Sequence, residues 1–222
     1  MAPGFGTAMQ HITFYFDFIS PYAYLAFERL PQALQGLSYH VTYKPVLFAA
    51  MLHQHGQKGP AEITPKRTWT YRQMQWLARE YGLPLQVPAS HPFNPIALLR
   101  LALACGHHGA CNRYVTETIF RHVWCTAQEA GDAVRLNTLT AKLQPRRLVS
   151  DDAVKTELRA NTDAALAAGV FGVPSLQLGI DVFWGLDALP MLRQCLADDP
   201  WFASAAWLNA GGLPVGIMRK TA

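Results

Sequence analysis

The feature of this sequence that most constrains its fold is a strand, a helix and a second strand near the N-terminus. Residues 11–18 are aromatic and β-branched, as in a short buried strand. An apolar helix follows to about Leu30, with Ser20 as a natural N-cap and Pro21 in its first turn. Residues 38–46 then alternate between apolar and polar side chains. Two strands joined through one helix in this way are parallel, with a right-handed connection.

The middle of the chain has helical periodicity, from about residue 48 to residue 168, interrupted by glycine and proline. A segment of this length is too long for a loop and predicts an inserted helical subdomain. Strand patterns return at residues 173–179 and 180–185, which predict a hairpin that turns near Gly179. Asp187 then begins a closing helix that reaches about Leu196.

The order βαβ, helical insertion, ββα is the layout of an α/β thioredoxin-like fold of the disulfide-oxidoreductase branch. The thioredoxin-like domain is therefore expected to be discontinuous in sequence. We expect it to consist of residues 9–50 and 169–203, with the helical insertion at 51–168, a leader at 1–8 and a tail at 204–222.

Composition narrows the classes of function. Charged residues make up 15% of the chain, so much surface is expected to be buried or kept for a ligand or a partner subunit. The net charge of +4 is scattered, without the basic cluster of a nucleic-acid-binding protein. No run approaches the roughly 18 apolar residues of a membrane span. We expect no nucleic-acid or membrane partner and no metal site, because the histidines lack companion carboxylates or cysteines.

The cysteines indicate a reducing environment. They are four in number, form no C-x-x-C pair and lie in apolar, helix-like stretches: Cys105, Cys111, Cys125 and Cys195. We expect them to be reduced thiols buried as small hydrophobic side chains, in a cytoplasmic protein.

The strand-to-helix junction at Ser20-Pro21 is the first candidate site. A group at a helix N-terminus lies near free N–H donors and the positive end of the helix dipole, which stabilise a thiolate. Thiol oxidoreductases place a C-P-x-C pair at such a junction, whereas this chain has Ser20 and Ala23 at the two cysteine positions. Ser20 is therefore expected to donate a hydrogen bond to the thiolate of a bound cofactor. The alternative is that Ser20 only caps the helix.

The second candidate site is Val173-Pro174, at the start of the third strand. Proline gives up a ladder donor inside a strand, and a cis peptide here would expose the backbone N–H and C=O of Val173. These two groups are suited to pairing with an extended peptide such as the cysteinyl part of glutathione. An ordinary edge or turn proline is the alternative.

Together these segments give the sequence a family resemblance. The chain resembles the 2-hydroxychromene-2-carboxylate isomerases and the related kappa-class glutathione transferases, from about Gln10 to Ala197. The most specific landmarks are F-D-F-x-S-P-Y-A-Y-L from Phe16 and G-V-F-G-V-P-S from Gly169. Supporting landmarks are Lys44-Pro45, Pro92-Phe93-Asn94-Pro95, Phe120-Arg121-x-Val123-Trp124 and Phe183-Trp184-Gly185-x-Asp187.

The resemblance implies roles for individual residues. By this resemblance, Ser20 would be the catalytic residue and would face the glutathione sulfur. The groups implied to bind glutathione are Val173, Pro174, Leu186, Asp187, Lys58 and Asn94. The groups implied to contact the substrate are Lys44, Tyr22, Phe93 and Trp124. Plainer alternatives are a helix cap for Asp187, which is compatible with ligand binding, a solvated loop lysine for Lys58, an edge-strand lysine for Lys44, a turn for Asn94, and core packing for the aromatic residues.

The resemblance implies a glutathione-dependent isomerase that acts on 2-hydroxychromene-2-carboxylate or a similar aromatic compound. Its chemistry would be reversible addition of the glutathione thiolate, ring opening and elimination. A homodimer is expected. Alternatives are a kappa-like glutathione transferase, a non-catalytic thiol- or peptide-binding module and, more weakly, disulfide exchange.

Overall fold

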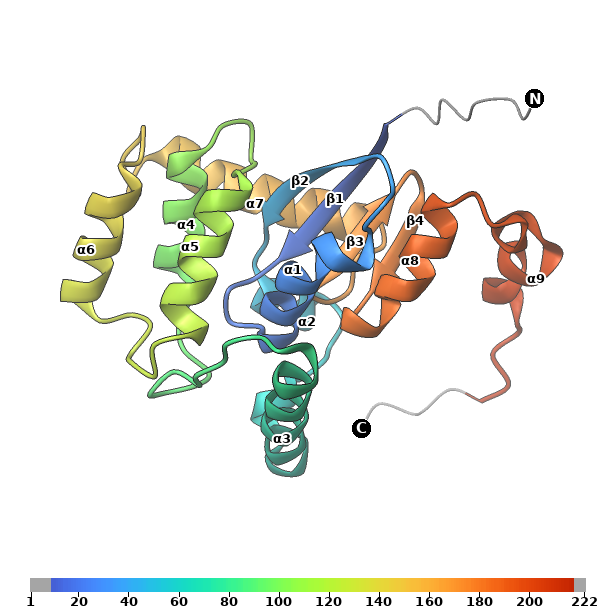
Figure 1. Cartoon of the computed structure of the whole chain (residues 1–222), viewed down its shortest axis with the longest axis horizontal. Helices are drawn as coiled ribbons and strands as arrows, with labels where there is room; N and C mark the ends of the chain where they lie inside the picture. The colour runs from blue at the N-terminus through green and yellow to red at the C-terminus, as the bar shows by residue number, and fades with distance from the viewer. Residues whose placement is uncertain (1–8, 218–222) are drawn as a thin grey trace.

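A four-stranded mixed sheet forms the centre of the molecule (Figure 1). The computed structural model describes residues 9–217, so the expected leader at 1–8 and the end of the expected tail lie outside it. The strands are β1 (Gln10–Phe16), β2 (Tyr39–Pro45), β3 (Ser175–Leu178) and β4 (Asp181–Trp184), in the order β2-β1-β3-β4. β1 runs parallel to β2 and antiparallel to β3, and β3 runs antiparallel to β4. The predicted βαβ unit and hairpin are therefore confirmed.

Helix α1 (Pro21–Ala33) and helix α8 (Leu189–Leu196) pack together on one side of the sheet (Figure 1). α1 begins where predicted, because Ser20 caps its first turn and Pro21 supplies a helical φ without needing a hydrogen-bond acceptor. Its Phe27 packs against Phe14 of β1, and both rings are fully buried. Burying a side chain of this size contributes about 1.5–3 kcal/mol.

The opposite side of the sheet carries α2 (Phe48–Gln54) and α7 (Asp152–Ala167). Successive side chains of a strand point to opposite faces, so Tyr15 of β1 points away from Phe14. Tyr15 belongs to a second, smaller hydrophobic cluster with Met51 of α2 and Ala165 of α7. α7 lies within the sequence range expected for the insertion, and it packs against β2.

The remaining helices stand beside the sheet. They are α3 (Thr64–Tyr81), α4 (Ile96–Cys105), α5 (Arg113–Trp124), α6 (Ala133–Leu143) and the short α9 (Ala205–Leu208). In Figure 1, α4, α5 and α6 lie together on one side, and α3 projects below. Over residues 9–217 no helix combines the length and apolarity needed to cross a bilayer.

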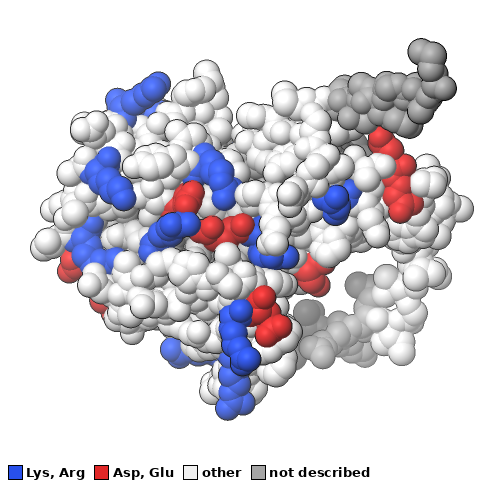
Figure 2. Space-filling view, in the orientation of Figure 1, with Lys and Arg blue, Asp and Glu red and all other residues white. Residues whose placement is uncertain are grey.

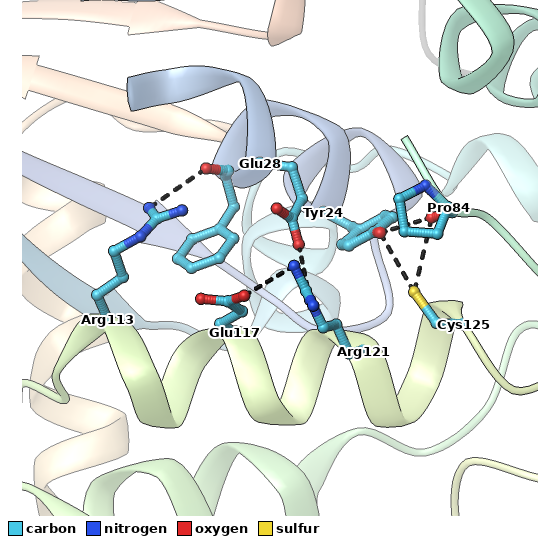
Figure 3. A network of polar contacts seen from close by, with 8 residues as sticks. Tyr24, Glu28, Pro84, Arg113, Glu117, Arg121 and Cys125 are labelled. Carbon is cyan, nitrogen blue, oxygen red and sulfur yellow. Dashed lines mark hydrogen bonds and ion pairs between the residues drawn. The ribbon is translucent and has the colours of Figure 1, made fainter. Parts of the chain in front are cut away.

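Polar contacts join α1 to the helical region, which consists of α3 to α6 and the loops between them (Figure 3). Arg121 of α5 pairs with Glu28 of α1 at 3.3 Å, and only 9% of the Glu28 side chain is exposed. The Tyr24 hydroxyl of α1 donates to the Pro84 carbonyl at 2.6 Å and lies 3.2 Å from Cys125 Sγ. α1 is therefore fixed on its sheet side by apolar packing and on its outer side by polar contacts.

The cysteines are all free thiols, as expected, but only Cys111 is buried. Burial raises the pKa of Cys111 to about 12. The prediction of burial was wrong for Cys105, Cys125 and Cys195, which are partly exposed. Two of these lie where helices end, Cys105 as the last residue of α4 and Cys125 as the C-cap of α5, so they are less covered than a mid-helix residue.

Charged side chains are sparse and mixed on the face of the molecule shown in Figure 2. Lysines and arginines are interspersed with acidic residues over both the sheet and the helical region, and much of this face is uncharged. This surface matches a composition with 15% charged residues.

Candidate functional site

Ser20 and Val173 meet across the start of α1, although 153 positions separate them in the sequence. Ser20 Oγ accepts a hydrogen bond from the Ala23 N–H at 3.2 Å, as an N-cap does. The same hydroxyl lies 3.5 Å from the Val173 carbonyl oxygen, at the long limit for a hydrogen bond. Ser20 is therefore a helix cap. Its hydroxyl donates at most a long, weak hydrogen bond, to the Val173 carbonyl.

The Val173–Pro174 peptide bond is cis. Among residues 9–217, the N–H of Val173 makes no hydrogen bond and its carbonyl accepts only the long contact from Ser20. The neighbouring groups are occupied, since Pro174 O accepts from Gly185 N at 2.9 Å and Gly172 O accepts from Ser175 Oγ at 2.8 Å. Val173 is 8% exposed, and its N–H and C=O are left free to pair in the manner of the edge of a sheet.

A buried carboxyl group holds the turn before Ser20. Asp17 is 1% exposed, and its two oxygens accept hydrogen bonds from the N–H groups of Ile19 and Phe48, each at 3.1 Å. Burial raises the pKa of Asp17 to about 7, and the two N–H donors act in the opposite direction. The carboxyl group ties the end of β1 to the start of α2.

Two side chains from the helical region bind the carbonyls of the same turn. Trp124 Nε1 donates to Phe18 O at 2.9 Å, and His91 Nε2 lies 2.8 Å from Ile19 O. Trp124 is fully buried, so it offers no ring surface to a substrate in this structure. Trp124 was expected to contact the substrate, but it packs in the core instead, and its indole N–H holds the turn.

His91 is a site residue that the sequence reasoning missed. Because a carbonyl only accepts, the contact with Ile19 O requires a proton on His91 Nε2. His91 Nδ1 lies 2.8 Å from the Tyr71 hydroxyl, and burial lowers the pKa of His91. The signal in the sequence was its position immediately before the Pro92-Phe93-Asn94-Pro95 landmark.

Two of the expected substrate residues, Tyr22 and Lys44, lie in the βαβ unit, in α1 and β2. Tyr22 follows Ser20 closely in α1, is half-buried, and donates its hydroxyl proton to Gln73 of α3 at 2.6 Å. Lys44 is half-buried in the edge strand β2, in register with Tyr15. Tyr22 is thus held close to Ser20, and Lys44 lies near the end of the neighbouring strand.

Leu186 and Asp187 follow β4 in a short 3₁₀ turn, Leu186–Ala188. This turn begins at Gly185, whose N–H binds the Pro174 carbonyl, so it lies beside the Val173 segment. Leu186 is buried, whereas Asp187 is exposed. α8 begins two residues later, with Ala188 as its N-cap and no side-chain cap, so the alternative role of Asp187 as a helix cap is wrong.

The other expected ligand residues lie elsewhere. Lys58 is exposed in the loop after α2. Asn94 Oδ1 accepts from the Ile96 N–H at 3.0 Å, so Asn94 serves as the turn residue of its plainer alternative. Asn94 and Phe93 line a cavity between α4 and α6, and Ser20 is not among its lining residues. In the described part of the chain, no group of three or more His, Cys, Asp or Glu residues is arranged to hold a metal ion.

Comparison with known proteins gives a consistent result. Residues 11–197 match the DsbA-like thioredoxin domain. A 2-hydroxychromene-2-carboxylate isomerase of Pseudomonas putida is 29% identical over 199 residues, which cover 83% of this chain and 93% of that protein. Glutathione S-transferase kappa 2 of Caenorhabditis elegans is 24% identical, covering 84% and 92%.

A solved structure of a 2-hydroxychromene-2-carboxylate isomerase superposes with a TM-score of 0.75 at 25% identity. The superposition covers 92% of this chain and 100% of that one. The resemblance noted in the sequence is thereby confirmed. Since the domain match spans most of the sequence, this chain belongs to the DsbA-like thioredoxin domain family.

Proposed function

We propose that this chain is a glutathione-dependent isomerase of 2-hydroxychromene-2-carboxylate or a similar aromatic compound. The observation that carries the proposal is that the Ser20 hydroxyl lies at the start of α1, 3.5 Å from the carbonyl oxygen of Val173, whose N–H makes no hydrogen bond within residues 9–217. The relatives named 2-hydroxychromene-2-carboxylate isomerase support the reaction class. The relatives named kappa-class glutathione transferase support the choice of thiol.

The groups around Val173 fit the chemistry of glutathione. The N–H and C=O of Val173 are suited to the backbone of a cysteinyl residue, which would place its sulfur towards Ser20. The exposed carboxylate of Asp187 suits the ammonium of a γ-glutamyl group. Lys58, on its exposed loop, is the proposed partner of the glycyl carboxylate, and Asn94 stays a proposed contact near the sulfur.

When bound, glutathione would supply a thiolate that adds reversibly to the conjugated system of the substrate. Ser20 would turn its hydroxyl from the Val173 carbonyl and donate its hydrogen bond to the sulfur. The N-terminus of α1 adds a favourable field for negative charge at the same point. The turn held by Asp17 keeps the hydroxyl in position, and Tyr22 and Lys44 are the proposed substrate contacts, with Lys44 supplying positive charge.

Ser20→Ala tests the role of the hydroxyl. We expect loss of one charge-assisted hydrogen bond to raise the pKa of the bound thiol by about 1–2 units and to weaken glutathione binding at neutral pH. Thiolate absorbance and calorimetry measure these two quantities. Ser204→Ala is the matched control, because it removes the N-cap of α9 without touching the site. Unchanged binding and unchanged thiol pKa in Ser20→Ala would refute the proposal.

A kappa-like glutathione transferase is the second candidate, favoured by the kappa-class relatives. Product analysis with glutathione in catalytic amount separates the two activities. An isomerase regenerates the thiol, whereas stoichiometric loss of thiol would establish conjugation. Binding of extended peptides without glutathione binding would instead indicate a non-catalytic module.

A homodimer in the reducing cytoplasm is the proposed form of the protein. The free cysteines fit a reducing compartment. Trp69 and Trp76 of α3 are 63% and 57% exposed and lie seven positions apart, on one side of the helix, where a second subunit would cover them. Light scattering after size-exclusion chromatography measures the oligomeric state directly.

A further inference from the structure

The cavity lined by Phe93 and Asn94 lies between α4 and α6. Its volume is about 860 Å³, within the range of sites that hold small organic ligands. Much of its wall is apolar and includes Phe93, Ile96, Leu136 and Val149. The cavity is therefore large enough and apolar enough for a ligand with a ring system.

The cation in this wall is Arg100 of α4. Its Nε atom is buried and has no hydrogen-bond partner. None of the ion pairs or side-chain hydrogen bonds found between residues 9 and 217 includes Arg100. A partly buried guanidinium beside apolar walls is costly to leave unpaired, and a carboxylate matches its fork of N–H donors.

The acidic residues of the cavity do not satisfy Arg100. Glu129 Oε2 accepts from Ser90 Oγ at 2.6 Å, and Asp132 Oδ1 accepts from the Arg135 N–H at 2.9 Å. Both side chains are exposed, so they lie at the solvent side of the cavity. Their charge disfavours a second anionic group at the outer end of a ligand.

We propose that this cavity is a binding site for a small aromatic monocarboxylate. The carboxylate binds the guanidinium of Arg100, and the ring lies against the apolar side chains of Phe93, Ile96 and Leu136. Ser20, Val173 and Asp187 are absent from its lining, whereas Phe93 and Asn94, which the resemblance implies for the Ser20 site, lie in it. The proposal does not depend on the proposed isomerase activity.

Naphthoate, naphthamide and a naphthalene dicarboxylate are suitable probes, with binding measured by calorimetry on the full chain. Naphthoate should bind at least about tenfold more tightly than its neutral amide, because the amide lacks the charge-assisted pair. The dicarboxylate should bind more weakly than naphthoate because of Glu129 and Asp132. Failure of naphthoate to bind, or equal binding of naphthoate and naphthamide, would overturn the proposal.

Two variants test whether the ligand binds in this cavity. Arg100→Met keeps the aliphatic stem but removes the charge, and should weaken naphthoate binding at least about tenfold. Ala97→Phe adds a ring to an exposed position of the cavity wall and should also block binding. Lys142→Met is the control, because Lys142 lines a neighbouring cavity between α5 and α6, and binding should not change.

The outcomes separate this site from the Ser20 site. Naphthoate binding that is lost in Lys44→Met but kept in Arg100→Met and Ala97→Phe would assign the ligand to the Ser20 site and refute the second site. Loss in Arg100→Met and Ala97→Phe alone would establish the second site. That result would hold even if Ser20→Ala left glutathione binding unchanged and the isomerase proposal failed.

Discussion

The turn that leads into Ser20 is held by side chains from two other parts of the chain and by Asp17 at its own start, whereas the segment opposite it leaves Val173 largely unbonded. Phe18 O and Ile19 O accept from Trp124 and His91, and the Ile19 N–H donates to Asp17. Across from this turn, the Val173 N–H makes no hydrogen bond within residues 9–217.

The contrast between the held turn and the unbonded Val173 suits a site in which the protein fixes the Ser20 hydroxyl and the ligand supplies the partners of the Val173 backbone. A hydroxyl that must meet a sulfur atom needs a fixed position, because small displacements reduce catalysis strongly. A backbone that must bind a peptide needs an unpaired donor and acceptor. The fixed turn and the open segment are therefore two requirements of one proposed site.

The largest predicted effect comes from the two tryptophans that adjoin these segments. Trp124→Ala should lower the free energy of unfolding by about 3–5 kcal/mol, because it removes a fully buried ring and the donor to Phe18 O. Trp184 is 53% exposed beside the Val173 segment, and Trp184→Ala should cost less than about 1 kcal/mol. Urea unfolding of both variants measures the contrast, and equal costs would contradict it.

A smaller effect should appear in the pH dependence of stability. The pKa of Asp17 is raised by burial from 3.8 to about 7, so the folded protein binds this proton more tightly than the unfolded chain. The Asp17 contribution is then fully present below pH 3.8 and is lost as the pH rises through about 7. From pH 5 to pH 8, the stability of the wild type relative to Asp17→Asn should fall by about 2–3 kcal/mol.

Denaturant unfolding of both proteins at several pH values checks this prediction. Subtracting the Asp17→Asn curve removes the contribution of other groups, including His91, whose lowered pKa acts in the opposite direction. A difference that does not change with pH would show that the two N–H donors to Asp17 offset or outweigh its burial.

The sequence was sufficient for the sheet and for the pairing of Ser20 with Val173. The strands follow from local patterns and the parallel-strand rule, whereas the joint role of Ser20 and Val173 came from the thioredoxin-like layout and the family resemblance. The landmark Pro92-Phe93-Asn94-Pro95 was also identified, but its place in space was not.

The remaining features depend on packing between distant segments. Neither the bond from Trp124 to Phe18 O nor that from His91 to Ile19 O can be derived from residue spacing, because α5 and the 91–95 loop reach this turn only through the packing of the helical region. The same holds for Asn94, which the resemblance implied to lie near the sulfur. Its Oδ1 instead accepts from the Ile96 N–H in the turn before α4, whose N-cap is Pro95.

The smallest predicted effect tests whether the segment around Val173 tolerates a larger side chain at Gly172. A Cβ atom on Gly172 would lie 2.7 Å from Trp184 Nε1, so Gly172→Ala requires the exposed indole to move. We expect a cost of about 1 kcal/mol, because the ring has solvent to move into. In a Trp184→Ala background the same substitution should be neutral within about 0.5 kcal/mol, as measured by a double-mutant cycle. An equal cost in both backgrounds would place the constraint in the backbone of this segment, which would then be as rigid as the turn before Ser20.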